Sequence, residues 1–176
     1  MKSALIVTLF LAAASASVMA QDSAAMAAAQ SACGPKNTNF DAKEDASQHP
    51  TPQPEPGSAL VYVVQDMGEE KCTGCALTRI GMDGSWVGAN QGTSYFFFTA
   101  EPGEHHLCLN WQSRFEWRNK AFAMATFTAE AGHAYYFRSR ISLSRSIYNF
   151  DFDPVNYDQG KFLVASSPLS VFHAKR

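Results

Sequence analysis

The sequence predicts an all-β protein: one antiparallel β-sandwich-like domain with a short C-terminal helix, preceded by a signal peptide and a disordered proline-rich segment. Between residues 58 and 172 the hydrophobic residues recur mostly with period two, which is the spacing of side chains on one face of a strand. Turn-forming pairs such as Asp83-Gly84 and Pro102-Gly103 separate these runs, roughly every 8–12 residues. Short strands at this spacing are typical of antiparallel sandwiches and barrels.

Composition narrows the classes of protein to consider. The 176 residues are 46% hydrophobic and carry a formal net charge of −2, which suits one globular domain with additional segments. Because 14 Lys and Arg face 16 Asp and Glu, a nucleic-acid binder that depends on a basic surplus is excluded. An aromatic content of 12% excludes a mostly disordered chain.

Residues 1–20 have the pattern of a signal peptide. Lys2 supplies the positive start, residues 4–14 are apolar, and Val18-Met19-Ala20 forms a small-residue cleavage site. The apolar run is shorter than the roughly 20 residues that a membrane span needs, so an uncleaved anchor is the weaker alternative. We therefore expect cleavage after Ala20, a periplasmic or secreted location, and no transmembrane segment in the mature chain.

Residues 21–57 differ from the rest of the chain and predict a disordered, Ala- and Pro-rich spacer. Prolines alternate at positions 50, 52, 54 and 56, and such prolines favour the extended polyproline II conformation. A stiff spacer of this kind would set the domain away from its N-terminus. The composition changes at residue 58, so we place the folded domain at residues 58–172.

Seven or eight strands are expected in that domain, followed by one helix. Residues 60–65 are apolar on both faces, which indicates a central strand, and Asp83-Gly84 is typical of a two-residue hairpin. Three consecutive phenylalanines at 96–98 favour a strand covered on both sides. The expected strands cover residues 60–65, 77–82, 86–89, 94–99, 105–112, 121–128, 133–142 and 145–153, and the helix covers 154–166.

Four short segments form an ordered pattern within this domain. They are residues 79–88, which contain D-G-x-x-V-G, Ser94-Tyr95-Phe96, the P-G-x-H turn at 102–105, and A-G-x-x-Y-Y at 131–136. Over about residues 58–165 the pattern resembles domain-of-unknown-function family 2846, which comprises small exported bacterial β domains, and more distantly PEGA-type surface modules. The resemblance implies the fold and export. It supplies no catalytic residue, because the family carries no established activity.

Cys72-Thr73-Gly74-Cys75 is a C-x-x-C motif, which allows a second interpretation as a periplasmic thiol-disulfide redox protein using Cys72 and Cys75. In thioredoxin-like enzymes the motif begins a helix whose dipole activates the first thiol. Here it precedes a strand without a surrounding βαβ pattern, so a structural disulfide is favoured. A c-type haem site would need His where Ala76 stands, and zinc would need further ligands at suitable spacing.

The four cysteines predict disulfides in an oxidising compartment. Cys108 shares a strand face with His106 and Asn110, away from Leu107, so its partner should come from a segment that covers this face. The preferred pairing is Cys75–Cys108. Cys33 and Cys72 are then either paired with each other or free.

The remaining candidate residues give weaker evidence of a functional site, and we expect no metal and no cofactor. His105 and His106 point to opposite faces of a strand and cannot chelate one ion together. Asn149, Asp151 and Asp153 share a face, which is more typical of a solvated strand than of a calcium site. One aromatic group lies among polar residues and could stack on sugar rings, although filling the core is the favoured alternative: Trp111, Phe115 and Trp117.

These observations together predict an exported, non-enzymatic, envelope-associated or secreted β module with a binding or structural role. The sequence contains no G-x-S-x-G, Walker or H-E-x-x-H motif. The expected partner is a cell-wall glycan or an envelope protein, and not nucleic acid.

Overall fold

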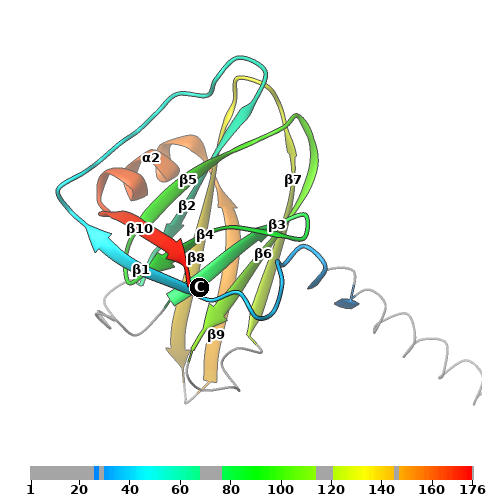
Figure 1. Ribbon diagram of the computed structural model, residues 1–176. Helices are drawn as coiled ribbons and strands as arrows, with labels where there is room; N and C mark the ends of the chain where they lie inside the picture. The colour runs from blue at the N-terminus through cyan, green and yellow to red at the C-terminus, as the bar shows by residue number, and fades with distance from the viewer. Residues whose placement is uncertain (1–25, 28–29, 68–76, 114–120, 145–146, 176) are drawn as a thin grey trace, which may run out of the picture.

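The computed structural model describes residues 26–27, 30–67, 77–113, 121–144 and 147–175, and confirms the all-β sandwich with a short C-terminal helix. Two sheets, one of six strands and one of four, pack face to face, and the helix lies against the outer side of the larger sheet (Figure 1). In the described part, no helix is long and apolar enough to cross a membrane.

The six-stranded sheet has the strand order β1-β10-β5-β2-β8-β9. Every residue of β2 is buried, and β2 lies between β5 and β8, which confirms its predicted central place. The strand bounds are β1 Phe40–Asp45, β2 Ala59–Gln65, β5 Tyr95–Ala100, β8 Ala134–Ser144, β9 Ile147–Val155 and β10 Leu169–Ala174.

The four-stranded sheet has the order β4-β3-β6-β7 and is antiparallel throughout. Its first hairpin turns at Asp83 and Gly84, whose φ angles of 50° and 88° both fall in the left-handed region. Two positive φ angles define the type I′ turn that the Asp-Gly pair predicts. The bounds are β3 Leu77–Met82, β4 Ser85–Gln91, β6 Gly103–Gln112 and β7 Phe122–Ala129.

Pairing in the larger sheet is mixed, whereas the sequence predicts antiparallel pairing. Strand β2 runs parallel to β8, and β10 runs parallel to β5. Neither pair is joined by a hairpin, because other strands lie between its members in the chain. Turn chemistry therefore gave no signal for these neighbours, and the pattern of short strands favoured the commoner antiparallel arrangement.

The core lies between the sheets and is built from alternate residues of the central strands. Val61 and Val63 of β2 and Phe137 of β8 face Ile80, Leu107 and Leu109 of the smaller sheet. The intervening residues of β2 form a second cluster on the outer face, where helix α2 (Tyr157–Ala165) packs. The helix begins later than predicted because β9 continues through Val155 and Asn156 caps the first turn.

The predicted disordered spacer is wrong for residues 30–57, and so is the domain boundary at residue 58. Strand β1 pairs along its whole length with β10, which extends the sheet beyond residue 172 as well. Residues 31–39 lie over the outer face of the smaller sheet, where Gly84 donates to the carbonyl of Ala32 and Trp86 donates to that of Pro35. Local composition does not reveal contacts with strands so distant in the chain.

A buried arginine fastens this N-terminal segment. Arg79 of β3 is 7% exposed, and its guanidinium donates hydrogen bonds to the side-chain oxygen of Asn110 and to the carbonyl of Thr38. The guanidinium also lies 4.4 Å from the ring centre of Trp86. Burial lowers the pKa of Arg79, and the carbonyl and amide oxygens supply the acceptors that its buried N–H groups require.

Candidate functional site

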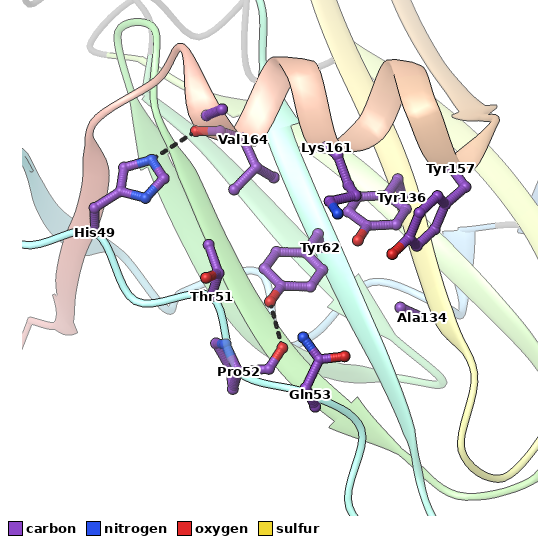
Figure 2. A pocket seen from close by; sticks show the side chains of 11 residues that line it. His49, Thr51, Pro52, Gln53, Tyr62, Ala134, Tyr136, Tyr157, Lys161 and Val164 are labelled. Carbon is purple, nitrogen blue, oxygen red and sulfur yellow. Dashed lines mark hydrogen bonds between the residues drawn. The ribbon is translucent and has the colours of Figure 1, made fainter.

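A pocket of about 200 Å³ opens on the outer face of the six-stranded sheet. Figure 2 shows that it lies between helix α2, strands β2 and β8, and the extended segment at residues 49–53. Its walls combine aromatic rings with hydrogen-bonding side chains. The lining residues are His49, Thr51, Pro52, Gln53, Tyr62, Ala134, Tyr136, Tyr157, Lys161, Val164 and Ala165.

One wall of the pocket is residues 49–53, which we call the proline strap. The hydroxyl of Tyr95 donates to the carbonyl of Pro50 over 2.9 Å, and that of Tyr62 donates to the carbonyl of Pro52 over 2.8 Å. His49 Nε2 lies 2.9 Å from the carbonyl of Val164 on α2, so this nitrogen carries the donated hydrogen. Prolines offer only carbonyl acceptors to the sheet, and the tyrosine hydroxyls supply the matching donors.

Stacked tyrosines form the floor. Tyr62 and Tyr136 are direct neighbours in the β2–β8 ladder, and their rings stack with centroids 5.1 Å apart and an interplanar angle of 7°. Burial, with a smaller contribution from Tyr136 and Tyr95, raises the pKa of Tyr62 to about 12. Burial also raises the pKa of Tyr95, and burial with a smaller contribution from the neighbouring Tyr157 raises the pKa of Tyr136. These hydroxyls therefore remain protonated donors at neutral pH.

Helix α2 supplies the third wall. The side chain of Asn156 accepts from the backbone N–H of Gln159 over 2.9 Å, which fixes the start of the helix beside β8. Tyr157 and Lys161 are one turn apart and share a face, and the Lys161 ammonium lies 5.1 Å from the ring centre of Tyr157. Tyr157 in turn meets Tyr136 edge-on, with centroids 5.8 Å apart.

Gly160 allows α2 to approach Tyr136 closely, so we expect its replacement by alanine to destabilise the protein rather than stabilise it. A Cβ at this position would lie 2.1 Å from Cγ of Tyr136. Replacing a helical glycine by alanine usually stabilises a helix by about 1 kcal/mol. Gly160→Ala should instead lower the free energy of unfolding by about 1–3 kcal/mol, because the helix must move away from Tyr136. Urea denaturation measures the change.

Gln159→Ala is the matched control for this substitution. It places alanine at the neighbouring helical position, where the side chain is half-buried and donates no hydrogen bond to the described residues. We expect a change within about 0.5 kcal/mol. A stabilising effect of Gly160→Ala would contradict the close packing of α2 on Tyr136.

The disulfide in the structure joins Cys33 to Cys108, with Cα atoms 5.1 Å apart. The predicted Cys75–Cys108 pairing is therefore wrong, and Cys33 does not pair with Cys72. The expectation that the partner would come from a segment that covers the outer face of β6 is correct, and this segment is residues 31–39. Cys72 and Cys75 lie outside the described residues.

Trp111 does not offer its ring to a ligand. It is 3% exposed and packs in a hydrophobic cluster with Met67 and Ile141. Its ring stacks with that of Phe150, with centroids 6.4 Å apart. The alternative interpretation, that Trp111 fills the core, is correct. Phe115 and Trp117 lie outside the described residues. The aromatic pocket lies on the six-stranded sheet, whereas Trp111 belongs to the four-stranded sheet.

His105 and His106 point to opposite faces of β6, as predicted. His106 is exposed, whereas His105 is 9% exposed and has Nδ1 2.6 Å from Asp83 Oδ2 and Nε2 2.7 Å from the carbonyl of Glu101. The other oxygen of Asp83 accepts the backbone N–H of His106 over 2.9 Å. This arrangement ties the β3–β4 hairpin to the start of β6.

The Asp83–His105 pair predicts a pH-dependent stability. Burial opposes the charge on His105, but hydrogen bonds with Asp83 and Glu101 outweigh it and raise the pKa of His105. Burial likewise opposes the charge on Asp83, and hydrogen bonds from His105 and His106 outweigh it and lower the pKa of Asp83. The His105 contribution is complete below its unfolded pKa of about 6.5 and is lost as pH rises through the folded value. The Asp83 contribution is present above about 3.9 and is lost as pH falls through its lowered value.

We therefore expect the pair to stabilise the fold most between about pH 4 and 6.5, and less on either side. Urea midpoints measured from pH 3 to 9 test this. Asp83→Asn should reduce the difference between the urea midpoints at pH 6 and pH 8.5, because it removes the charge that stabilises protonated His105. Asparagine still tolerates the left-handed turn conformation. An unchanged pH profile in Asp83→Asn would rule out the pair as its origin.

Metal-ligating side chains do not gather in the described part: no group of three His, Cys, Asp or Glu residues lies close enough to hold an ion. Asp151 and Asp153 are exposed on β9, whose neighbour β8 places Arg140 and Arg138 opposite them. The side chain of Asn149 lies outside the described part.

Comparison of the chain with models of protein families, with curated proteins and with solved structures finds no significant match. The resemblance to domain-of-unknown-function family 2846 therefore stays a hypothesis drawn from the motifs.

Proposed function

We propose that this chain is an exported, non-enzymatic module of the cell envelope or the extracellular space that binds a cell-wall glycan. The tyrosine-lined pocket carries the proposal, since aromatic rings beside a few hydrogen-bonding groups are typical of small-ligand sites. Tyrosine rings provide apolar contact area for a sugar, and Gln53, Thr51 and Lys161 provide polar partners. An envelope protein is the second candidate partner.

The chemistry of the lining residues supports binding rather than catalysis. None of them is an aspartate or glutamate that could act as a carboxylate base. The raised pKa values of Tyr62 and Tyr136 keep both hydroxyls protonated, so neither acts as a phenolate base near neutral pH. Protonated hydroxyls and an ammonium group are donors that suit the oxygen atoms of a glycan.

The Cys33–Cys108 disulfide is consistent with an oxidising, extracytoplasmic compartment, since such bonds are rare where thiols are kept reduced. The disulfide supports a periplasmic or secreted location. Export by the signal peptide, with cleavage after Ala20, is part of the proposal and rests on the sequence pattern. The alternative of a thiol-disulfide enzyme using Cys72 and Cys75 predicts turnover in an insulin-reduction assay. The described fold is a two-sheet sandwich rather than a thioredoxin fold.

A pull-down on purified cell-wall glycan tests the proposal with the full mature chain. We expect retention of the wild-type protein and loss of retention on glycan digested to soluble fragments. Tyr157→Ala should weaken retention, because Tyr157 lines the pocket and is 57% exposed, so its removal leaves the core intact. Phe162→Ala on the same helix is the control, being 66% exposed and outside the pocket.

Retention that survives Tyr157→Ala unchanged would overturn the assignment of the pocket. No retention of the wild type on glycan, together with retention on a protein-containing envelope fraction, would favour the envelope-protein partner and overturn the glycan proposal.

A further inference from the structure

The pocket has a net positive character. Lys161 is the only lysine or arginine among the lining residues, and no lining residue is acidic. Within the described part of the chain, no carboxylate forms an ion pair with Lys161. The ammonium group is held at the pocket over the ring of Tyr157. An anionic group on the ligand would therefore meet a charge that the protein leaves uncompensated.

The pocket is small. Its volume of about 200 Å³ is below the roughly 300–1,000 Å³ of sites that enclose a whole drug-sized ligand. It can accommodate one ring rather than several linked rings. A terminal residue of a chain, or a free monosaccharide, fits this limit.

Hydrogen-bonding groups surround that volume without partners among the described residues. The hydroxyls of Tyr136 and Tyr157 and the side chains of Thr51 and Gln53 line the pocket, and none of them forms a hydrogen bond within the described part. In Figure 2 the hydroxyls of Tyr136 and Tyr157 point in a similar direction, and the amide of Gln53 lies on the proline strap. These groups include both donors and acceptors, as a polyhydroxylated ring requires.

From this arrangement we infer that the pocket binds a single sugar ring that carries a carboxylate, with the carboxylate at Lys161 and the ring against the tyrosines. The inference rests on the proposed function and specifies its ligand. A neutral sugar would offer the Lys161 ammonium no anionic partner, and a simple carboxylate would leave the amide and hydroxyl groups unused. An acidic sugar satisfies both sets of groups.

Chemical-shift titration of the full mature protein tests the inference with three probes: D-glucuronate, D-glucose and acetate. We expect glucuronate to bind about tenfold more tightly than glucose, as one hydrogen bond to a charged group implies, and acetate to bind more weakly than glucuronate. The shifted amides should map to Thr51, Gln53 and residues 134–136 and 157–165. Added salt should weaken glucuronate binding more than glucose binding.

Lys161→Met separates charge from packing. It keeps an unbranched helical side chain and should reduce the affinity for glucuronate about tenfold, to the level of glucose. Lys36→Met is the matched control, because Lys36 is exposed in the segment that covers the other sheet and lies outside the pocket. We expect no change in affinity for this variant.

Equal binding of glucuronate and glucose, unaffected by Lys161→Met, would overturn the acidic-sugar inference while leaving glycan binding intact. Binding of acetate as tight as that of glucuronate would overturn the role of the sugar ring. Absence of binding by any probe, in a protein still retained on cell-wall glycan, would overturn the inference and not the proposed function. Loss of retention on glycan would overturn the proposed function itself.

Discussion

Removal of the Cys33–Cys108 disulfide is expected to lower the free energy of unfolding by about 4 kcal/mol. The bond joins residues 75 positions apart, and the chain-entropy treatment gives about 4–5 kcal/mol for cross-linking a loop of that length. A Cys33→Ser, Cys108→Ala variant serves as the test, since alanine suits the fully buried position of Cys108 and serine suits half-buried Cys33. Urea denaturation of this variant and of the oxidised wild type gives the difference.

Peptide mapping without reduction is the control that identifies the bond itself. Cys108 should resist alkylation until a reductant is added, and a fragment that links Cys33 with Cys108 should be recovered. Free alkylation of Cys108 in the native, oxidised protein would contradict the pairing.

Phe137→Ala is expected to cost about 3–5 kcal/mol, which is typical of truncating a buried phenylalanine. Phe137 of β8 is 1% exposed, and its ring contacts Phe127 of the smaller sheet and Phe152 of β9. Truncation would leave a cavity at the junction of both sheets, which the surrounding strands cannot fill without moving. Equilibrium unfolding monitored by tryptophan fluorescence measures the loss.

Phe162→Ala provides the matched control for Phe137→Ala. It makes the same chemical change at a helix position that is 66% exposed, where the expected loss is within about 0.5 kcal/mol. Losses of similar size in the two variants would contradict the placement of the core between the sheets.

Much of the fold could be predicted because its signals are local. The apolar run at residues 60–65 identified the central strand β2, and Asp83-Gly84 identified a hairpin whose left-handed conformation those two residues tolerate. The opposite faces of His105 and His106 followed from strand geometry alone. In each case the sequence and the structural consequence lie within a few residues.

The elements that escaped prediction depend on distant partners. Strand β1 is largely charged, and only its pairing with β10 identifies it as a strand. The sequence predicted on which face of β6 the partner of Cys108 would lie, but not which segment supplies it. No local pattern in residues 31–39 indicates that they cover β6. Composition instead favoured a spacer.

The candidate site was missed for a related reason. Its walls come from the strap, from β2 and β8, and from α2, which are far apart in the chain. One signal could have pointed to it: a tyrosine such as Tyr62 in an otherwise largely apolar strand needs a partner for its hydroxyl. The alternating prolines at 50 and 52 offer carbonyl acceptors without competing donors, and the structure pairs them with Tyr62 and Tyr95.

The pairing of β1 with β10 has a consequence for the order in which the protein assembles. Among the described strands of its sheet, β1 is hydrogen-bonded only to β10, so β1 can pair only after residues 169–174 have been synthesised. Until residues 169–174 arrive, β1 is tethered to the nascent sandwich but has no ladder to join. Contacts of such long sequence separation slow folding. We therefore expect the pairing of β1 with β10 to be a late step of folding, which completes the edge of the six-stranded sheet.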